Sequence, residues 1–161
     1  MFGNKNTEKS NMTKDQVYNL IKTSLDSAGL KYNEKKEEGV IMTGFVGDDL
    51  PISMNIVVND VTIRFVCLLD FKAEPDNYSK VTWELNCINK NLIFGAFYLD
   101  PDDGYVMFED AFPYKEAQVS KDFILAFTKM IGETVDKYDG NLKKVAERVP
   151  RSNNHSGPMY G

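Results

Sequence analysis

The chain has 161 residues, of which 42% are hydrophobic, and a formal net charge of −5. A chain of this length fits a single domain, and a domain of this size buries roughly 70% of the surface that its unfolded chain exposes. The excess of acidic residues argues against nucleic acid or an anionic membrane surface as a partner, because both require a basic footprint. The composition therefore favours a protein partner.

The residues that form disulfides and zinc sites are few: Cys67, Cys87 and one histidine, His155. Two sulfurs and one remote imidazole do not complete a tetrahedral zinc site. Cys67 falls in an apolar strand pattern and Cys87 in a helical one, so we expect two buried free thiols and a reducing compartment. Residues 1–10 lack the apolar core of a leader, and no run approaches the ~20 apolar residues of a membrane span. We therefore expect a cytoplasmic protein without metal or cofactor.

The first predicted helix follows a polar N-terminus, residues 1–12, that we expect to be disordered. Thr13 and Gln16 have the spacing of a capping box, which predicts the start of a helix. Gly29 follows as its left-handed stop. Between them, apolar residues recur at three- and four-residue intervals along one stripe: Val17, Leu20, Ile21, Leu25 and Ala28.

Alternating patterns after residue 30 predict three strands, over residues 40–45, 52–58 and 61–69. The link Asn59–Asp60 predicts a tight hairpin, because both residues tolerate positive φ. The strands therefore form an antiparallel meander. A sheet with helices on one side should be polar on the other. The face opposite the cleanly apolar one nevertheless carries five apolar residues: Ile41, Phe45, Val57, Val66 and Leu68.

A second helix is predicted over residues 78–92, and Trp83 and Cys87 are rotated off its core stripe. A two-strand hairpin follows, over residues 94–99 and 105–112. Ser120 caps a third, long helix, which the pair Asp139–Gly140 either ends or kinks.

The C-terminal residues 150–161 have no periodic pattern, and we expect them to be disordered. Residues 13–149 then form one α+β domain. Its antiparallel sheet, a meander plus a C-terminal hairpin, is flanked by three helices.

No group of residues has the spacing of a catalytic or metal site. The turn Asp100–Gly104 gathers three aspartates, but its glycine is fifth where a calcium loop requires it sixth. An exposed turn also offers no pocket that would shift a carboxyl pKa for acid–base catalysis. We interpret Asn86, Asn89 and Asn91 as structural amides that satisfy nearby backbone groups. We therefore expect the protein not to be an enzyme.

Two apolar features have no partner in the predicted fold. The first is the surplus on the sheet, which includes Val57, Val66 and Leu68. The second is Trp83 with Cys87, about one turn apart and directed away from the core. A homodimer interface would bury such residues. The alternative is that the third helix or the C-terminal tail covers both patches.

Three segments carry a resemblance to a known family: Leu85-Asn-Cys-Ile-Asn89, Phe94-Gly-Ala-Phe-Tyr-Leu-Asp100 and Gly104-Tyr-Val-Met-Phe108. Together with the predicted order of elements, which is helix, meander, helix, hairpin and long helix, these segments resemble the YbjN-like domain family. Its members are labelled as sensory transduction regulators and are similar in fold to type III secretion chaperones. The resemblance covers residues 13–149 and implies a small acidic bacterial protein that dimerises and binds proteins without catalysis.

The resemblance also suggests a binding surface, because secretion chaperones hold a client segment across apolar patches on the first helix and the sheet. The candidate partner-binding residues are then Leu20, Val57, Val66 and Leu68. We expect a non-catalytic protein-binding module, chaperone-like or regulatory, whose client the sequence does not name. The alternative is a small-molecule-sensing regulatory domain with a pocket between sheet and helices. A hydrolase is disfavoured, because Ser, His and Cys never converge in the pattern.

Overall fold

The computed structural model describes residues 12–115 and 117–148. Residues 1–11 and 149–161 lie outside the described residues. They include His155 and most of the two segments that we expect to be disordered. Two short 3-10 helices, Lys36–Glu38 and Pro75–Asn77, precede β2 and α2. The helices and strands are α1 (Lys14–Ser27), β1 (Tyr32–Lys35), β2 (Val40–Val46), β3 (Pro51–Val58), β4 (Thr62–Lys72), α2 (Tyr78–Asn89), β5 (Ala96–Leu99), β6 (Tyr105–Pro113) and α3 (Lys121–Ala146).

Six strands form one antiparallel sheet in the order β1-β2-β3-β4-β6-β5. Strands β1 to β4 are a meander, and β6 pairs with β4, so the C-terminal hairpin extends the sheet and β5 becomes an edge. The predicted α+β fold is confirmed. β1 has no counterpart among the predicted strands, because its sequence Tyr-Asn-Glu-Lys lies on a largely exposed edge and shows no apolar alternation.

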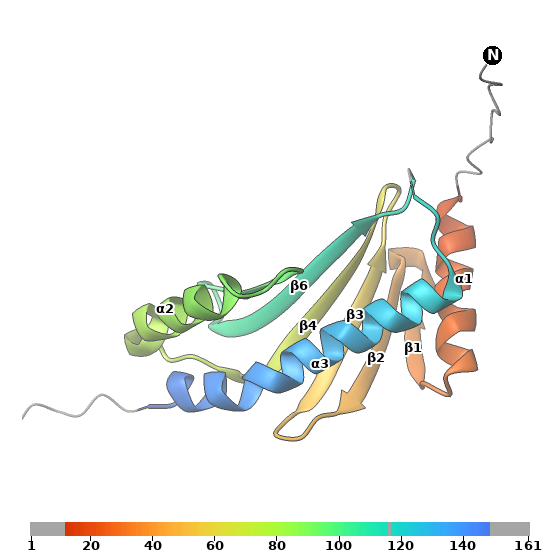
Figure 1. Cartoon of the computed structure of the whole chain (residues 1–161). Coiled ribbons are helices and arrows are strands. Elements are labelled where there is room, and N and C mark those ends of the chain that lie inside the picture. The colour runs from red at the N-terminus through yellow and green to blue at the C-terminus, as the bar shows by residue number, and fades with distance from the viewer. Residues whose placement is uncertain (1–11, 116, 149–161) are drawn as a thin grey trace, which may run out of the picture.

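The three helices pack on one side of the sheet (Figure 1). α3 crosses the strands, and α1 and α2 pack against it toward opposite ends of the sheet. Aromatic side chains join α3 to the sheet: the ring centroids of Phe65 and Phe127 are 5.0 Å apart, and those of Phe97 and Tyr138 are 5.9 Å apart. The core therefore lies between the helices and this face. We call the opposite side the outer face; no helix of the described residues packs against it.

The strand register corrects one prediction about the sheet faces. Ile41 pairs with Ile56, and Phe45 pairs with Ile52, so both lie on the face that packs against α3. The prediction that Ile41 and Phe45 belong to the opposite face is wrong. β2 carries apolar side chains on both of its faces, so its alternation alone does not show which set meets the helices. The other members of the predicted surplus do lie on the outer face: Val57, Val66 and Leu68.

The predicted helix starts are confirmed. Thr13 Oγ1 accepts a hydrogen bond from the Gln16 backbone N–H at 3.2 Å, and the Thr13 N–H donates to Gln16 Oε1 at 2.9 Å, which completes the capping box. Ser120 Oγ accepts from the Phe123 N–H at 3.1 Å and caps α3. Both helices thus begin where a side chain satisfies an otherwise unpaired backbone donor.

α3 continues through Asp139 and Gly140 and does not end there. Both residues are buried. A Cβ atom on Gly140 would collide with the carboxylate of Asp49 in the β2–β3 loop. The glycine therefore marks a close approach between this loop and the helix, which the helical pattern alone does not distinguish from a stop signal.

The β3–β4 link closes by a different mechanism from the one predicted. No described non-glycine residue has a positive φ, so Asn59 and Asp60 do not adopt the expected conformation. Instead, Asn59 Oδ1 accepts hydrogen bonds from the backbone N–H groups of Val61 and Thr62, at 2.9 and 2.7 Å. The asparagine side chain mimics a backbone turn, which tightens the link between β3 and β4.

Candidate functional site

The outer face presents its side chains in three rows that follow from the strand register. Neighbours within a row lie directly opposite one another on adjacent strands and therefore interact. The first row, across β3, β4, β6 and β5, is Ser53, Leu68, Met107 and Tyr98. The second, across the same strands, is Asn55, Val66, Glu109 and Ala96. The third, across β2, β3, β4 and β6, is Val40, Val57, Arg64 and Ala111.

A diagonal of apolar side chains crosses these rows, and we call it the apolar stripe: Val57, Val66, Leu68, Met107 and Tyr98. Leu68 is 40% exposed and Tyr98 is 38% exposed, whereas Val66 at the centre is 9% exposed. Adjacent strands are about 4.8 Å apart, and each row step advances about 6.8 Å along a strand. Three strand intervals and two row steps therefore give the stripe a length of roughly 20 Å.

An ion pair lies beside the apolar stripe. Arg64 Nε donates to Glu109 Oε1 across β4 and β6 at 2.6 Å. This hydrogen bond raises the pKa of the Arg64 guanidinium above its ordinary value. An exposed pair contributes only about 0–1 kcal/mol to folding. The pair therefore supplies fixed charges beside the stripe, to which polar groups of a partner can hydrogen-bond.

Leu20 is not part of this surface. It lies on α1, partly buried against the hydrophobic core. α1 packs against α3, on the side of the sheet where the helices lie. The structure therefore brings together Val57, Val66 and Leu68 and separates them from Leu20.

Trp83 lies on the exposed side of α2, as its rotation off the core stripe predicts. It is 68% exposed, while Leu85 two positions later is 3% exposed. Cys87, one turn along the same helix, is half-buried. Thr82 and Asn86 line one shallow hollow with Trp83 and another with Tyr98. Trp83 thus lies near the β5 end of the apolar stripe.

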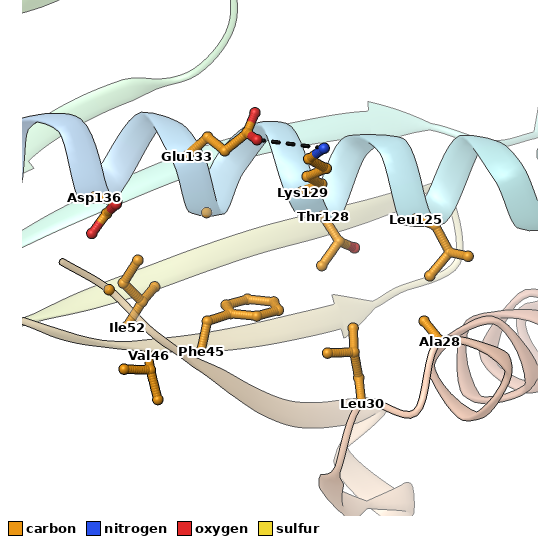
Figure 2. A pocket seen from close by; sticks show the side chains of 12 residues that line it. Ala28, Leu30, Phe45, Val46, Ile52, Leu125, Thr128, Lys129, Glu133 and Asp136 are labelled. Carbon is orange, nitrogen blue, oxygen red and sulfur yellow. Dashed lines mark ion pairs between the residues drawn. The ribbon is translucent and has the colours of Figure 1, made fainter.

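A cavity lies on the other side of the sheet, between α3, the C-terminal end of α1 and strands β2 and β3 (Figure 2). Its volume is about 410 Å³, within the 300–1,000 Å³ range that is typical of small-molecule sites. We call it the α3 cavity. Most of its lining is apolar: Ala28, Leu30, Phe45, Val46, Ile52 and Leu125.

The polar groups of the α3 cavity come from α3. Thr128 is 1% exposed, and its Oγ1 has no hydrogen-bond partner among the described residues. Lys129 and Glu133 form an ion pair of 3.6 Å, one turn apart on the helix (Figure 2). Asp136 Oδ1 accepts from the backbone N–H of Asp48 at 2.6 Å, which fixes the β2–β3 loop against the helix.

Two aspartates of the acidic hairpin turn accept hydrogen bonds from nearby backbone groups. In the acidic hairpin turn, Asp100 Oδ1 accepts from the Asp102 N–H at 2.9 Å, and Asp103 Oδ1 accepts from the Tyr105 N–H at 3.0 Å. Within residues 12–115 and 117–148, no three or more His, Cys, Asp or Glu side chains are grouped so that they could hold a metal ion. Cys67 and Cys87 are both free thiols. Cys87 is only half-buried, so the prediction that it is buried is wrong. Cys67 is buried, as predicted, and burial raises the pKa of its thiol to about 12. A thiol that remains protonated at neutral pH is a poor nucleophile.

Two of the predicted structural amides are confirmed in that role. Asn89 Nδ2 donates to the Phe97 carbonyl, and the Phe97 N–H donates to Asn89 Oδ1, both at 2.9 Å. Asn91 Nδ2 donates to the Cys87 carbonyl at 3.0 Å. Because Phe97 lies on the edge strand β5, the Asn89 amide pairs with it as a neighbouring strand would.

These features define a class of protein: an α+β domain whose six-stranded antiparallel sheet has helices on one side and an uncovered second face. The chain belongs to the YbjN family, as its sequence suggests. The family model matches residues 18–144 and is described as "Putative bacterial sensory transduction regulator". The description names a regulator and not an enzyme.

Two solved structures have the same fold. YbjN from E. coli, "a putative transcription regulator", is 14% identical over 77% of this chain and 89% of its own, with a TM-score of 0.62. An uncharacterized protein from Methanothermobacter thermautotrophicus is 16% identical over 80% of this chain and 97% of its own, with a TM-score of 0.56. At these identities the likeness shows the fold alone. The search of curated proteins gives no match. Among the described residues, the helices are all too short or too polar to cross a bilayer.

The α3 cavity was not located by sequence reasoning, although a pocket between sheet and helices was an alternative. Its lining combines residues 28–52 with residues 125–136 of α3, which come much later in the chain. A signal in the sequence is Gly132, a glycine inside a long helical pattern, which usually has a packing or functional reason.

Proposed function

We propose that this chain is a non-catalytic regulatory domain that binds a segment of another protein along the apolar stripe. The observation that supports the proposal is the exposure of Leu68 and Tyr98 on a sheet face that no described helix covers. Apolar side chains surrounded by polar ones are typical of protein interfaces. The proposed place of action is the cytoplasm, in keeping with two free thiols.

The shape of the stripe favours a single extended or helical segment as its occupant. A helix of about 13 residues, or an extended segment of about six, spans roughly 20 Å. Ser53 and Asn55 flank the stripe on one side, and the pair Arg64–Glu109 flanks it on the other. A flat contact between two whole sheet faces would bury that ion pair, and the cost of desolvating two charges opposes such burial. A narrow amphipathic segment avoids this cost.

The proposal also includes a homodimer formed through Trp83 and Cys87. Its support is the 68% exposure of the tryptophan, since tryptophan is strongly enriched among the residues that dominate binding energy at interfaces. This contact uses α2, whereas the protein segment binds the sheet; Trp83 lies near the β5 end of the apolar stripe.

The test is to place a photo-crosslinking amino acid at position 68 and, as a matched control, at position 61. Val61 is also apolar and 51% exposed, but it lies in the β3–β4 link, away from the stripe. In the native cell, position 68 should crosslink to a defined protein that position 61 does not capture. With that protein purified, Leu68→Asp should weaken binding at least tenfold, which is about 1.4 kcal/mol, and Val61→Asp should leave it unchanged. No adduct at position 68, or the same adducts at both positions, would reject the apolar stripe as the binding surface.

A further inference from the structure

Thr128 is the first sign that the α3 cavity is built to hold a ligand. A threonine hydroxyl inside a helix commonly donates to the carbonyl four residues earlier, as Thr134 does to Met130 at 2.8 Å. Thr128 makes no such bond to any described group, although it is 1% exposed. Its side chain projects from α3 toward the strands and lines the cavity (Figure 2). A buried hydroxyl left unpaired is unfavourable, and an acceptor atom inside the cavity would remove this cost.

Gly132, one turn after Thr128 on the same helix, is the second sign. Its backbone is helical, with no positive φ that would require glycine. A Cβ atom built there would lie 3.8 Å from the nearest atom of the Phe45 ring, an ordinary contact. Glycine in a helix interior is destabilising relative to alanine. Neither backbone conformation nor packing therefore demands glycine here, and its effect is to leave the space above Phe45 open.

The charges around the cavity restrict the ligand. Lys129 and Glu133 compensate each other in an ion pair. Asp136 adds a negative charge at the end where the β2–β3 loop, with Asp48 and Asp49, packs against α3. A carboxylate-bearing amphiphile would meet repulsion from these groups. The remaining lining is apolar, and burying a cationic group against it would cost desolvation energy, so a neutral molecule fits best.

From these observations we infer that the α3 cavity binds a small, neutral, largely apolar molecule that accepts a hydrogen bond from Thr128 through a carbonyl oxygen. The site lies on the side of the sheet opposite the apolar stripe, shares no residue with it and does not depend on the proposed protein partner. Apolar walls with a few placed polar groups are the usual composition of small-molecule sites.

The probe for this site is Prodan, a neutral naphthyl ketone whose emission shifts to the blue in apolar surroundings. Titration into the wild-type chain should give a saturable blue shift. Gly132→Leu fills the cavity and should weaken binding at least tenfold. Gly132→Ala, the matched control, adds only the Cβ that the structure accommodates and should bind within about twofold of the wild type. Thr128→Val keeps the shape without the hydroxyl and should weaken binding about fivefold, as expected for one hydrogen bond.

A second measurement needs no variant and locates the probe directly. In methyl NMR spectra of the wild-type chain, Prodan should shift the resonances of Leu125 and Thr128 and leave those of Leu68 on the outer face unchanged. The inference is overturned if Prodan does not saturate, if it shifts Leu68 and not Leu125, or if a folded Gly132→Leu variant binds it as well as the wild type does.

Discussion

Asp139 should make the stability of the domain rise as the pH falls. The residue is 1% exposed on α3, and its Oδ1 has no hydrogen-bond partner among the described residues. Burial raises the pKa of its carboxyl group to about 6, and the nearby carboxylates of Asp136 and Asp49 add to the shift. A hydrogen bond from the Gly140 backbone N–H acts in the opposite direction without cancelling it.

The sign follows from the protons bound in each state. An unfolded aspartate titrates near pH 3.9, so between about pH 4 and about pH 6 the folded chain binds more protons at this position than the unfolded chain does. The stabilising contribution is complete below the unfolded pKa and is lost as the pH rises through the folded one. With a folded pKa of about 6, lowering the pH from about 8 to about 5 should stabilise the fold by about 1.4 kcal/mol through this group alone.

The perturbation is Asp139→Asn, which keeps the shape and removes the titration. Urea unfolding followed by far-ultraviolet circular dichroism should show the variant to be more stable than the wild type at about pH 8, and the difference between the two free energies of unfolding should shrink by about 1.4 kcal/mol as the pH falls to about 5. The comparison is made between the two chains at each pH, so the contributions of the other carboxyl groups cancel. Parallel pH profiles, or a variant that is less stable at the higher pH, would contradict the assignment of a buried, destabilised carboxylate at this position.

Two other predictions concern α2 and its contacts. Asn89→Ala should lower the free energy of unfolding by about 1–3 kcal/mol, because it leaves both backbone groups of Phe97 unpaired. Amide hydrogen exchange at Phe97 should accelerate. Asn91→Ala, which frees only the Cys87 carbonyl, should lower the free energy of unfolding by less. Trp83→Glu should halve the mass seen by light scattering from twice 18.3 kDa to the single-chain value, with a change in stability within about 0.5 kcal/mol. Leu85→Ala, which truncates a core residue of the same helix, should lower the free energy of unfolding by about 2–5 kcal/mol. A wild-type chain that is already monomeric at tens of micromolar would refute the dimer.

The features that the sequence predicts correctly are those that depend on residues close together in the chain. Capping residues act within one helical turn, so Thr13 with Gln16 and Ser120 mark the helix starts correctly. The hydrophobic period of α2 also suffices to place Trp83 outside and Leu85 inside. In each case, contacts within three or four residues determine the outcome.

Features that depend on distant contacts were not predictable in the same way. The faces of β2 were assigned incorrectly because Ile41 and Met42 are both apolar, and only pairing with β3 shows that Ile41 meets the core. The continuation of α3 through Gly140 depends on Asp49, about 90 positions earlier in the chain. The α3 cavity is likewise an outcome of packing. Gly132 is a local sign of an opening on α3, but it does not show that α1 and two strands lie across from it.

The apolar stripe and the α3 cavity share strand β3, whose alternation separates them. Ile52 points into the cavity, and the next residue, Ser53, points to the outer face beside Leu68. Coupling between two such sites requires an element with two arrangements that both ligands bias, and a continuous antiparallel ladder from β2 to β4 holds this strand in one register. Leu68→Asp and Gly132→Leu should therefore act additively on stability, within about 0.5 kcal/mol, and saturating Prodan should leave the affinity for the protein segment unchanged. A coupling energy well above that value would show that β3 has a second arrangement, and the cavity would then regulate the outer face.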